Sequence, residues 1–472
     1  MRNSVTRLLL SLLLFLVIVG SLSATPLYTF EVLLEAAQQN NTTLHKAQQE
    51  LQRSLLDVKD AKGKRWPTID FTLSGTYMVN PQIGPIVLDP DEILGTIEWP
   101  AGFSPVSGGD YITLYDGMEN THYQAEMTLT QPIFTWGKIS KAIKLTQQLS
   151  NIRSLQLSDQ RSKIESELAI HLDALYHLGK IADLLEEGSL IVERLEEIAK
   201  EAYASGLILE LDLLKATVGR SELEIAQEKI AHQQRLLLLN LRTLCGISNL
   251  ELTSIDHSAT TERYHALLTV NSQELINAAI SSARPTISAL SLSESLAKTA
   301  VDLEKANLNW KPDLALVVSV GYGGPRLPLF ETDWYRQNDY TLNLTLGLQT
   351  TIWDGGEQLR AVKRRISEQE SASSDAIAAR EQIIQTLSES LSALRLALAN
   401  NNYLEKKIAY LDENIKIEEA KVAAGYGEEG DYLQVQLEYL NTKIALEQNL
   451  LEASTHFHTI SLLSGWQSSF KY

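Results

Sequence analysis

Cysteine is almost absent from this 472-residue chain, which contains one, Cys245. A single cysteine excludes a disulfide within the chain and a thiolate metal cluster. Methionine is scarce too, with four residues, so a relay of soft-metal ligands lacks its donors. After residue 20 no apolar run reaches the length of a membrane-spanning helix, which excludes a polytopic helical membrane protein. The net charge of −18 argues against nucleic acid as a partner, because phosphates favour clustered lysine and arginine.

Catalytic and metal-ligating patterns are also missing. Neither His171 with His177 nor His456 with His458 has the i, i+4 spacing that places two ligands on one face of a helix. No nucleophile stands with a base in a recognisable arrangement. Cys245 closes an apolar stretch, which indicates a buried small side chain. We therefore predict that the protein is not an enzyme and holds no cofactor or metal.

The N-terminus has the pattern of a secretory signal peptide. Arg2 and Arg7 supply positive charge, residues 8–20 are almost wholly apolar, and residues 21–24 are mostly small. We expect residues 1–24 to be removed and the protein to be exported.

Proline is confined to two stretches of the chain. All 12 prolines lie within 26–132 or 285–328, so that 133–284 and 329–472 contain none. Both proline-free regions are rich in Leu, Ala, Glu, Gln, Lys and Ser, the composition of long helices. A stripe typical of a coiled coil, which an ordinary amphipathic helix can also produce, consists of Leu433, Leu437, Leu440, Ile444 and Leu451.

The chain contains an internal repeat at an offset of 219 residues. The glycines at 137, 206 and 246 recur at 356, 425 and 465, and Asp212 recurs as Asp431. No insertion interrupts this spacing, as expected for packed helices, where a slip would rotate the apolar stripe away from its partner. Each repeat therefore predicts a long helix, a tight turn and a returning helix. The predicted hairpins cover 137–246 and 355–465.

Further elements surround these hairpins. Helical segments are expected at roughly 28–64 and 272–310, before the two hairpins, and residues 247–271 are expected to form an equatorial linker. The first repeat thus covers 25–246 and the second 272–472. Strict alternation of apolar and polar residues predicts two strands in each repeat. These strands cover 68–80, 122–134, 313–323 and 340–352.

The alternation is also the pattern of a transmembrane barrel, with apolar side chains outward and polar side chains inward. A soluble, half-buried sheet is the alternative. Four tryptophans favour the membrane, because they bracket the strands as an interfacial girdle would: Trp66, Trp136, Trp310 and Trp353. Four strands alone would leave unpaired edges in lipid, so the chain must oligomerise.

The ordered set of these features resembles the TolC family of outer-membrane efflux proteins over essentially the whole mature chain. The matching segments include the turns at 134–137 and 352–356 and the hairpin turns at 204–207 and 423–426. The resemblance implies an α+β membrane protein. Its long antiparallel helical hairpins would form a coiled-coil α-barrel, and four strands per protomer would complete a 12-stranded β-barrel in a homotrimer. The helical tunnel would lie in the periplasm.

The resemblance also implies where the tunnel closes. In the family, acidic residues near the tip of the second hairpin form a ring at the entrance, and Asp431 matches the first of them. The next position is Gln434, so one ring is missing. The tyrosine and arginine that hold the entrance shut in the best-known members are replaced by Val422 and Gly427. That latch cannot operate here, and closure must use other contacts.

Two carboxylates, Glu428 and Glu429, add charge to the second tip and complete the predicted entrance gate with Asp431. The alternative for Asp431 is a helix N-cap or first-turn carboxylate, and both roles can hold together. For Asp212 the structural role is favoured. The tips implied to dock the adaptor consist of Gly206, Leu207, Asp212, Gly425 and Tyr426. Both tip glycines are expected to be left-handed turn residues.

The implied function is a passive exit duct in a tripartite efflux system, which conducts small molecules to the exterior. Its partners would be outer-membrane lipid, a periplasmic adaptor (membrane fusion) protein and an inner-membrane transporter that supplies the energy. A type I protein-secretion duct of the same fold is one alternative, and a periplasmic coiled-coil scaffold is a second. Residues 81–121 contain seven carboxylates and no lysine or arginine, and they are expected to form an outward-facing loop. A cation-binding or pore-capping role for this loop is the alternative.

Overall fold

The chain is described by a computed structural model. The described residues are 28–79, 83–95, 98, 100–101, 110–115, 117, 119–255, 262–308, 310–325 and 339–466. The predicted signal peptide, 1–24, lies outside them. No described helix is both long enough and apolar enough to cross a membrane.

Contacts divide the chain into two compact units. The first consists of Met1–Leu55, Gln148–Leu296 and Glu370–Tyr472, and the second of Leu56–Gln147 and Ala297–Gln369. The first unit is helical. The second contains the sheet and the helix ends next to it in the sequence.

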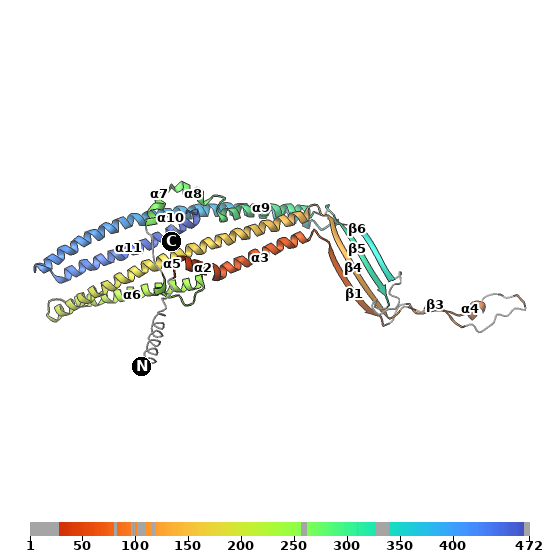
Figure 1. Cartoon of the computed structure of the whole chain (residues 1–472), viewed down its shortest axis with the longest axis horizontal. Helices are drawn as coiled ribbons and strands as arrows, with labels where there is room; N and C mark the ends of the chain where they lie inside the picture. The colour runs from red at the N-terminus through yellow and green to blue at the C-terminus, as the bar shows by residue number, and fades with distance from the viewer. Residues whose placement is uncertain are drawn as a thin grey trace, which may run out of the picture. The chain divides into compact units, whose positions relative to one another are not determined.

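Two helical hairpins dominate the first unit (Figure 1). Helix α5 (Lys138–Ala204) pairs with α6 (Glu210–Cys245), and α10 (Glu357–Ala423) pairs with α11 (Glu429–Ser464). All four bounds of the first hairpin recur in the second at the offset of 219 residues found in the sequence. The glycines of the repeat all have positive φ, from 68° to 81°, which a residue with a side chain rarely adopts. The left-handed turns expected at Gly206 and Gly425 are therefore confirmed.

The segment before the first hairpin is not one helix, contrary to the expectation for 28–64. It forms α2 (Phe30–Asn40) and α3 (Thr42–Gly63), separated at Asn41. The Asn41 side chain accepts hydrogen bonds from the backbone N–H groups of Thr43 and Leu44, at 3.0 and 3.1 Å. It caps α3, and its amide donates to the carbonyl of Leu244. Asparagine favours this cap because its side chain competes with the backbone for hydrogen bonds.

The equivalent segment, 272–310, is also divided, into α8 (Ser272–Ala279) and α9 (Pro285–Ala306). Proline at the first helical position starts α9 at no cost, because its missing N–H would have no partner there. Between the repeats lie the short helices η1 (Leu252–Ser254) and α7 (Glu262–Thr269).

Each hairpin has an apolar core where the shorter helices pack against it. Around the first hairpin, α2 and α3 meet α5 and α6 through fully buried side chains such as Leu33, Leu168 and Leu241. Around the second, α7 and α8 meet α10 and α11 through Leu267, Leu394 and other side chains. Cys245 is buried in the first core, as expected from the sequence, and burial raises the pKa of its thiol to about 11.

Four antiparallel strands form the sheet of the second unit (Figure 1). They are β1 (Thr68–Tyr77), β4 (Thr121–Phe134), β5 (Asp313–Gly324) and β6 (Tyr340–Gln349). Their order is β1-β4-β5-β6, so the two strands of each repeat are neighbours and the repeats join at β4 and β5. Inside the acidic segment 81–121, β2 (Ile86–Leu88) pairs with β3 (Ile112–Tyr115), and α4 (Pro90–Gly95) lies between them in the sequence.

Candidate functional site

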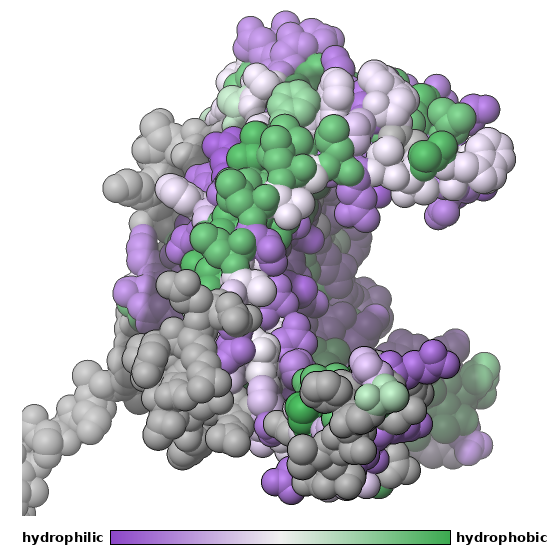
Figure 2. Space-filling model, turned by 90° about the vertical axis from the view of Figure 1, so that its right-hand side faces the viewer, coloured by the Kyte–Doolittle hydropathy of each residue, from purple (hydrophilic) through white to green (hydrophobic). Residues whose placement is uncertain are grey.

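The four-stranded sheet has one apolar and one polar face. Its register aligns Ile69 with Leu129, Leu129 with Val318, and Val318 with Leu344, so an apolar row crosses all four strands. The adjacent row is polar or small on the other face, because successive side chains of a strand point to opposite faces. Figure 2 shows a band of hydrophobic side chains beside hydrophilic ones on the surface of the chain.

The apolar face is exposed rather than packed. On β6, Leu342, Leu344, Leu346 and Leu348 are each between 65% and 73% exposed. A soluble half-buried sheet would cover such a row with other side chains. A contiguous apolar surface of this kind indicates a protein or membrane contact.

All four predicted interface tryptophans lie where the strands meet the helices, and all are exposed. Trp136 is the least exposed, at 38%, and its indole N–H donates to the carbonyl of Pro312 at 2.9 Å. Its ring packs edge-on against that of Trp310. Trp66 and Trp353 are 74% and 82% exposed. Their apolar rings and polar N–H groups suit a membrane–water interface.

The tip of the second hairpin consists of residues 424–428, with α11 beginning at Glu429. Tyr426 is 90% exposed. A side chain at Gly427 would not fit, because its Cβ would lie 2.9 Å from the Cβ of Lys421. The turn in this conformation therefore requires glycine at the position where the resemblance expects an arginine.

The three predicted gate carboxylates occupy the start of α11. Glu428 is the N-cap residue but makes no capping hydrogen bond with its side chain, and Glu429 and Asp431 lie in the first turn. The first-turn role considered for Asp431 is therefore present, since carboxylates there interact favourably with the helix dipole. Asp431 is exposed.

Glu429 has a partner that the sequence did not reveal. Arg194 of α5 donates to both oxygens of the Glu429 carboxylate, at 2.8 and 3.0 Å, and also to Glu197 at 3.2 Å. The hydrogen bond from Arg194 lowers the pKa of Glu429, which stays ionised. The pair connects the first hairpin to the second close to their tips. The sequence did contain a signal for this pair. The residue that corresponds to Arg194 in the second repeat, 219 positions later, is Glu413, so the charge at this position is opposite in the two repeats.

The tip of the first hairpin, residues 205–209, is apolar. Leu207 and Leu209 are 79% and 72% exposed. Asp212 lies in the first turn of α6 and pairs with Lys215 at 3.1 Å, which agrees with the structural role favoured for it. Apolar side chains at this end are available to a protein partner.

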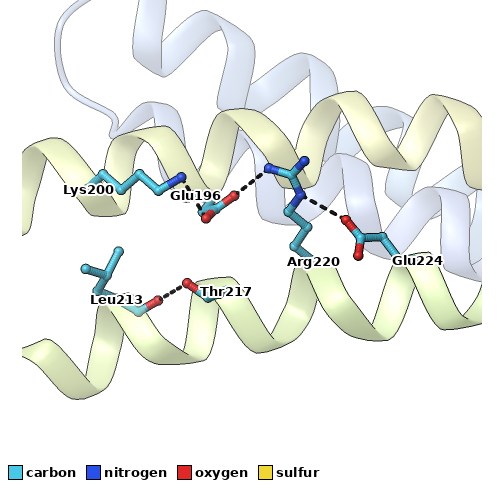
Figure 3. A network of polar contacts seen from close by, with 6 residues as sticks. All are labelled: Glu196, Lys200, Leu213, Thr217, Arg220 and Glu224. Carbon is cyan, nitrogen blue, oxygen red and sulfur yellow. Dashed lines mark hydrogen bonds and ion pairs between the residues drawn. The ribbon is translucent and has the colours of Figure 1, made fainter.

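A polar network holds α5 to α6 near this tip (Figure 3). The carboxylate of Glu196, which is almost fully buried, accepts from Lys200 at 2.7 Å and from Arg220 at 3.0 Å. These hydrogen bonds lower the pKa of Glu196. Arg220 reaches on to Glu224 at 3.2 Å. Pairing and hydrogen bonding together compensate the burial of the charge.

The packing of α5 against α11 joins the two repeats within the chain. The Asp173 carboxylate accepts from the hydroxyl of Ser454 at 2.5 Å and lies 2.8 Å from Nε2 of His458. Nearer the tips, Nδ1 of the fully buried His177 lies 2.7 Å from Glu447. The described residues contain no cluster of three or more histidine, cysteine or carboxylate side chains that could hold a metal ion.

These features, an exposed apolar sheet face, tryptophans at the sheet–helix junctions and paired long hairpins, define the class of an outer-membrane channel. The model of the family described as outer membrane efflux protein matches residues 33–247 and 275–465. The chain belongs to this family. It is an efflux channel protein of the outer membrane, and its family is one of channels rather than enzymes.

Solved structures with the same fold have low sequence identity to the chain. VceC of Vibrio cholerae is 16% identical with a TM-score of 0.70, over 92% of this chain and 96% of that one. CmeC of Campylobacter jejuni is 14% identical with a TM-score of 0.70, over 94% and 87% of the two chains. The open state of MtrE from Neisseria gonorrhoeae is 14% identical with a TM-score of 0.65, over 92% and 88%. No curated protein matches the chain.

Proposed function

We propose that three copies of the chain form the exit duct of a tripartite efflux system. The observation that supports this is the four-stranded sheet, which has one exposed apolar face and whose edge strands, β1 and β6, pair with no further strand among the described residues. Free edges in lipid leave backbone groups unpaired, and pairing β6 of one copy with β1 of the next removes them. Three sectors of four strands make a barrel of 12 strands, within the range of known outer-membrane barrels.

The polar face of the sheet would then line the lumen. It carries threonines and single charged residues such as Asp70 and Glu126, which are compatible with water. Solute would enter at the hairpin tips, pass between the helices and leave through the barrel. Energy would come from an inner-membrane transporter connected by a periplasmic adaptor, since the chain has no nucleotide-binding motif.

We place the periplasmic entrance at the start of α11. Asp431 is exposed there, and three copies of it around one axis would favour cations and repel anions. Glu429 contributes less net charge to that ring, because Arg194 neutralises it. The exposed Leu207 and Tyr426, together with the turns at Gly206 and Gly425, would provide the adaptor with an apolar docking surface.

The first test is the symmetry of the particle. Protein extracted from outer membranes in mild detergent is expected to show three-fold symmetry by electron microscopy. A particle that stays in solution without detergent, or one that lacks a three-fold axis, would refute the duct.

The entrance is tested by single-channel recording in planar bilayers. Asp431→Asn is expected to lower cation selectivity and to weaken block by divalent cations, because it removes the ring of charge. The matched control is Asp212→Asn, at the same position of the first hairpin, where Lys215 already pairs with the carboxylate. Equal effects of the two substitutions would refute the assignment of Asp431 to the entrance.

A further inference from the structure

Positive charge is concentrated where the helices meet the sheet, although the whole chain has a net charge of −18. Four segments join helices to strands at this end of the sheet (Figure 1), and together we call them the collar: residues 56–67, 135–147, 297–312 and 350–366. The collar contains 14 lysine and arginine residues and 6 carboxylates, a net charge of +8. All of it belongs to the second compact unit. The collar is therefore a basic region within an acidic protein.

The opposite end of the sheet has the opposite charge. The two connections at that end, 78–120 and 325–339, contain ten carboxylates and two arginines, a net charge of −8. The sheet thus separates a basic end from an acidic one. In the duct proposed above the sheet crosses the outer membrane and the helices lie in the periplasm, so the basic end meets the headgroups of the periplasmic leaflet.

The collar holds its positive charge at the level of the interface tryptophans. Gln131 of β4 donates to the backbone carbonyl of Arg65 at 3.0 Å, which ties the residue before Trp66 to the sheet. Nζ of Lys311 lies 4.7 Å from the centre of the Trp310 ring. A cation in contact with an indole that suits the membrane–water interface lies at the depth of the lipid headgroups.

Several cations of the collar are exposed and have no carboxylate partner in the part of the chain that the structure describes. They include Lys64, Arg65, Lys363 and Arg364. The Asp354 carboxylate, at the start of α10, instead accepts from the backbone N–H groups of Gly356 and Gln358 at 2.8 and 2.9 Å. The four cations are therefore available to an anion from outside the chain.

Both pairs of cations lie within reach of a headgroup layer. Lys64 and Arg65 directly precede Trp66. Lys363 and Arg364 lie six and seven residues after α10 begins at Glu357, which is about 9–10 Å along the helix axis. The headgroup region on one side of a bilayer is about 5–8 Å thick, and long basic side chains extend toward it.

We propose that the collar binds anionic phospholipids of the periplasmic leaflet through their phosphate groups, with phosphatidylglycerol as the simplest ligand. The inference rests on the membrane position of the sheet in the proposed duct and does not require three copies. The collar borders the exposed apolar face, so a lipid whose chains cover that face has its headgroup at the collar. Arginine can bind two phosphate oxygens at once, and lysine supplies a point charge. Basic clusters next to a membrane-embedded segment attract anionic lipids in this way.

Tryptophan quenching by brominated lipids tests the collar, because bromine quenches an indole only when the labelled lipid is in contact with it. Four of the seven tryptophans belong to the collar and report the lipid bound there. The protein is reconstituted in phosphatidylcholine vesicles that contain increasing fractions of brominated phosphatidylglycerol or, in a parallel series, brominated phosphatidylcholine. Half-maximal quenching is expected at an about fivefold lower fraction of the anionic lipid. Salt at about 0.5 M should reduce this preference, because it screens exposed charges.

The collar variant replaces all four exposed cations: Lys64→Gln, Arg65→Gln, Lys363→Gln and Arg364→Gln. Its preference for phosphatidylglycerol is expected to fall to about twofold or less. The matched control removes two arginines and two lysines that are exposed in the first unit: Arg53→Gln, Arg161→Gln, Lys229→Gln and Lys406→Gln. The control is expected to keep the original preference, because these residues lie outside the collar.

The outcomes separate the collar from the membrane position of the sheet. An unchanged preference in the collar variant, or an equal loss in the control, would overturn the inference. If the original protein were quenched by neither brominated lipid, the sheet would not be in the bilayer and the proposed duct would fail as well. If the fourfold collar variant did not insert, Lys64→Gln with Arg65→Gln and Lys363→Gln with Arg364→Gln are compared separately. Each pair is expected to lose part of the preference, and no loss in either would refute the collar.

Discussion

An arginine placed on the apolar face of the sheet should weaken the folding of the chain into a membrane. Leu344 is the site we choose, because it lies near the middle of the ten-residue β6 and is 73% exposed. Its row across the sheet contains Val318, Leu129 and Ile69, so a charge there has no polar neighbour in that row.

The expected magnitude follows from the depth of the residue. An arginine facing lipid costs about 2–4 kcal/mol at the middle of a barrel strand and about 0–1 kcal/mol near the interfaces. Since every 1.4 kcal/mol is a factor of ten, Leu344→Arg should reduce the folding equilibrium constant of each chain by roughly 30-fold to 1,000-fold. In a trimer the change occurs three times, at about 6–12 kcal/mol per particle.

The matched control is Thr345→Arg, the next residue along the same strand. Its side chain points to the polar face, where an arginine meets water and should have little effect on folding. Both variants are compared by urea-dependent folding into phospholipid vesicles, with heat-modifiable gel mobility as the measure of folded protein. Similar urea midpoints for the two variants would refute the assignment of the faces, as would a lower midpoint for Thr345→Arg.

The remaining predictions concern the helices. Asn449 of α11 donates hydrogen bonds to a backbone carbonyl of α10 and to the buried Asn401, so Asn449→Ala should lower the free energy of unfolding by about 1–3 kcal/mol. The double variant Asn449→Ile with Asn401→Ala copies the apolar pair Ile230 and Ala182 at the corresponding positions of the first hairpin, and it should recover most of that loss. The measurement is thermal unfolding followed by circular dichroism. A melting temperature of the double variant below that of Asn449→Ala would contradict this prediction. Burial lowers the pKa of His171 below its ordinary value of 6.5. As the pH falls, His171 therefore takes up a proton more readily in the unfolded chain than in the folded one, so the free energy of unfolding should decrease below pH 6.5. His171→Gln should reduce the difference between melting temperatures at about pH 7.5 and about pH 5.5, and an unchanged difference would count against this residue.

Much of the fold could be predicted because it depends on local patterns. Alternation marked the four long strands within a few residues of their ends, since a strand with one apolar face must repeat every two residues. Glycine marked the hairpin turns, because positive φ at Gly206 and Gly425 excludes most other residues. The offset of 219 residues then predicted the bounds of the second hairpin from those of the first.

Other features escaped because they depend on how distant segments pack. The break at Asn41 arises from contacts with the end of α6, and the expectation of one helix over 28–64 was wrong for that reason. The ion pair of Arg194 with Glu429 joins residues 235 positions apart. Glu429 and Asp431 at the start of α11 look equivalent in the sequence, and both are exposed, but of the two only Glu429 has an arginine partner among the residues that the structure describes.

The sequence by itself determined the elements and the two faces of the sheet, because hydrophobic period and turn chemistry are properties of short segments. Only the tertiary structure decided which helices adjoin and which charges are neutralised. Pairing of β4 with β5 joins the two repeats through the sheet. His177 is buried, whereas Leu396, at the corresponding position of the second repeat, is exposed. Corresponding positions of the two repeats have the same local sequence pattern but are buried to different extents. The reason is that only one of the two helices packs against another helix of the same chain at that position.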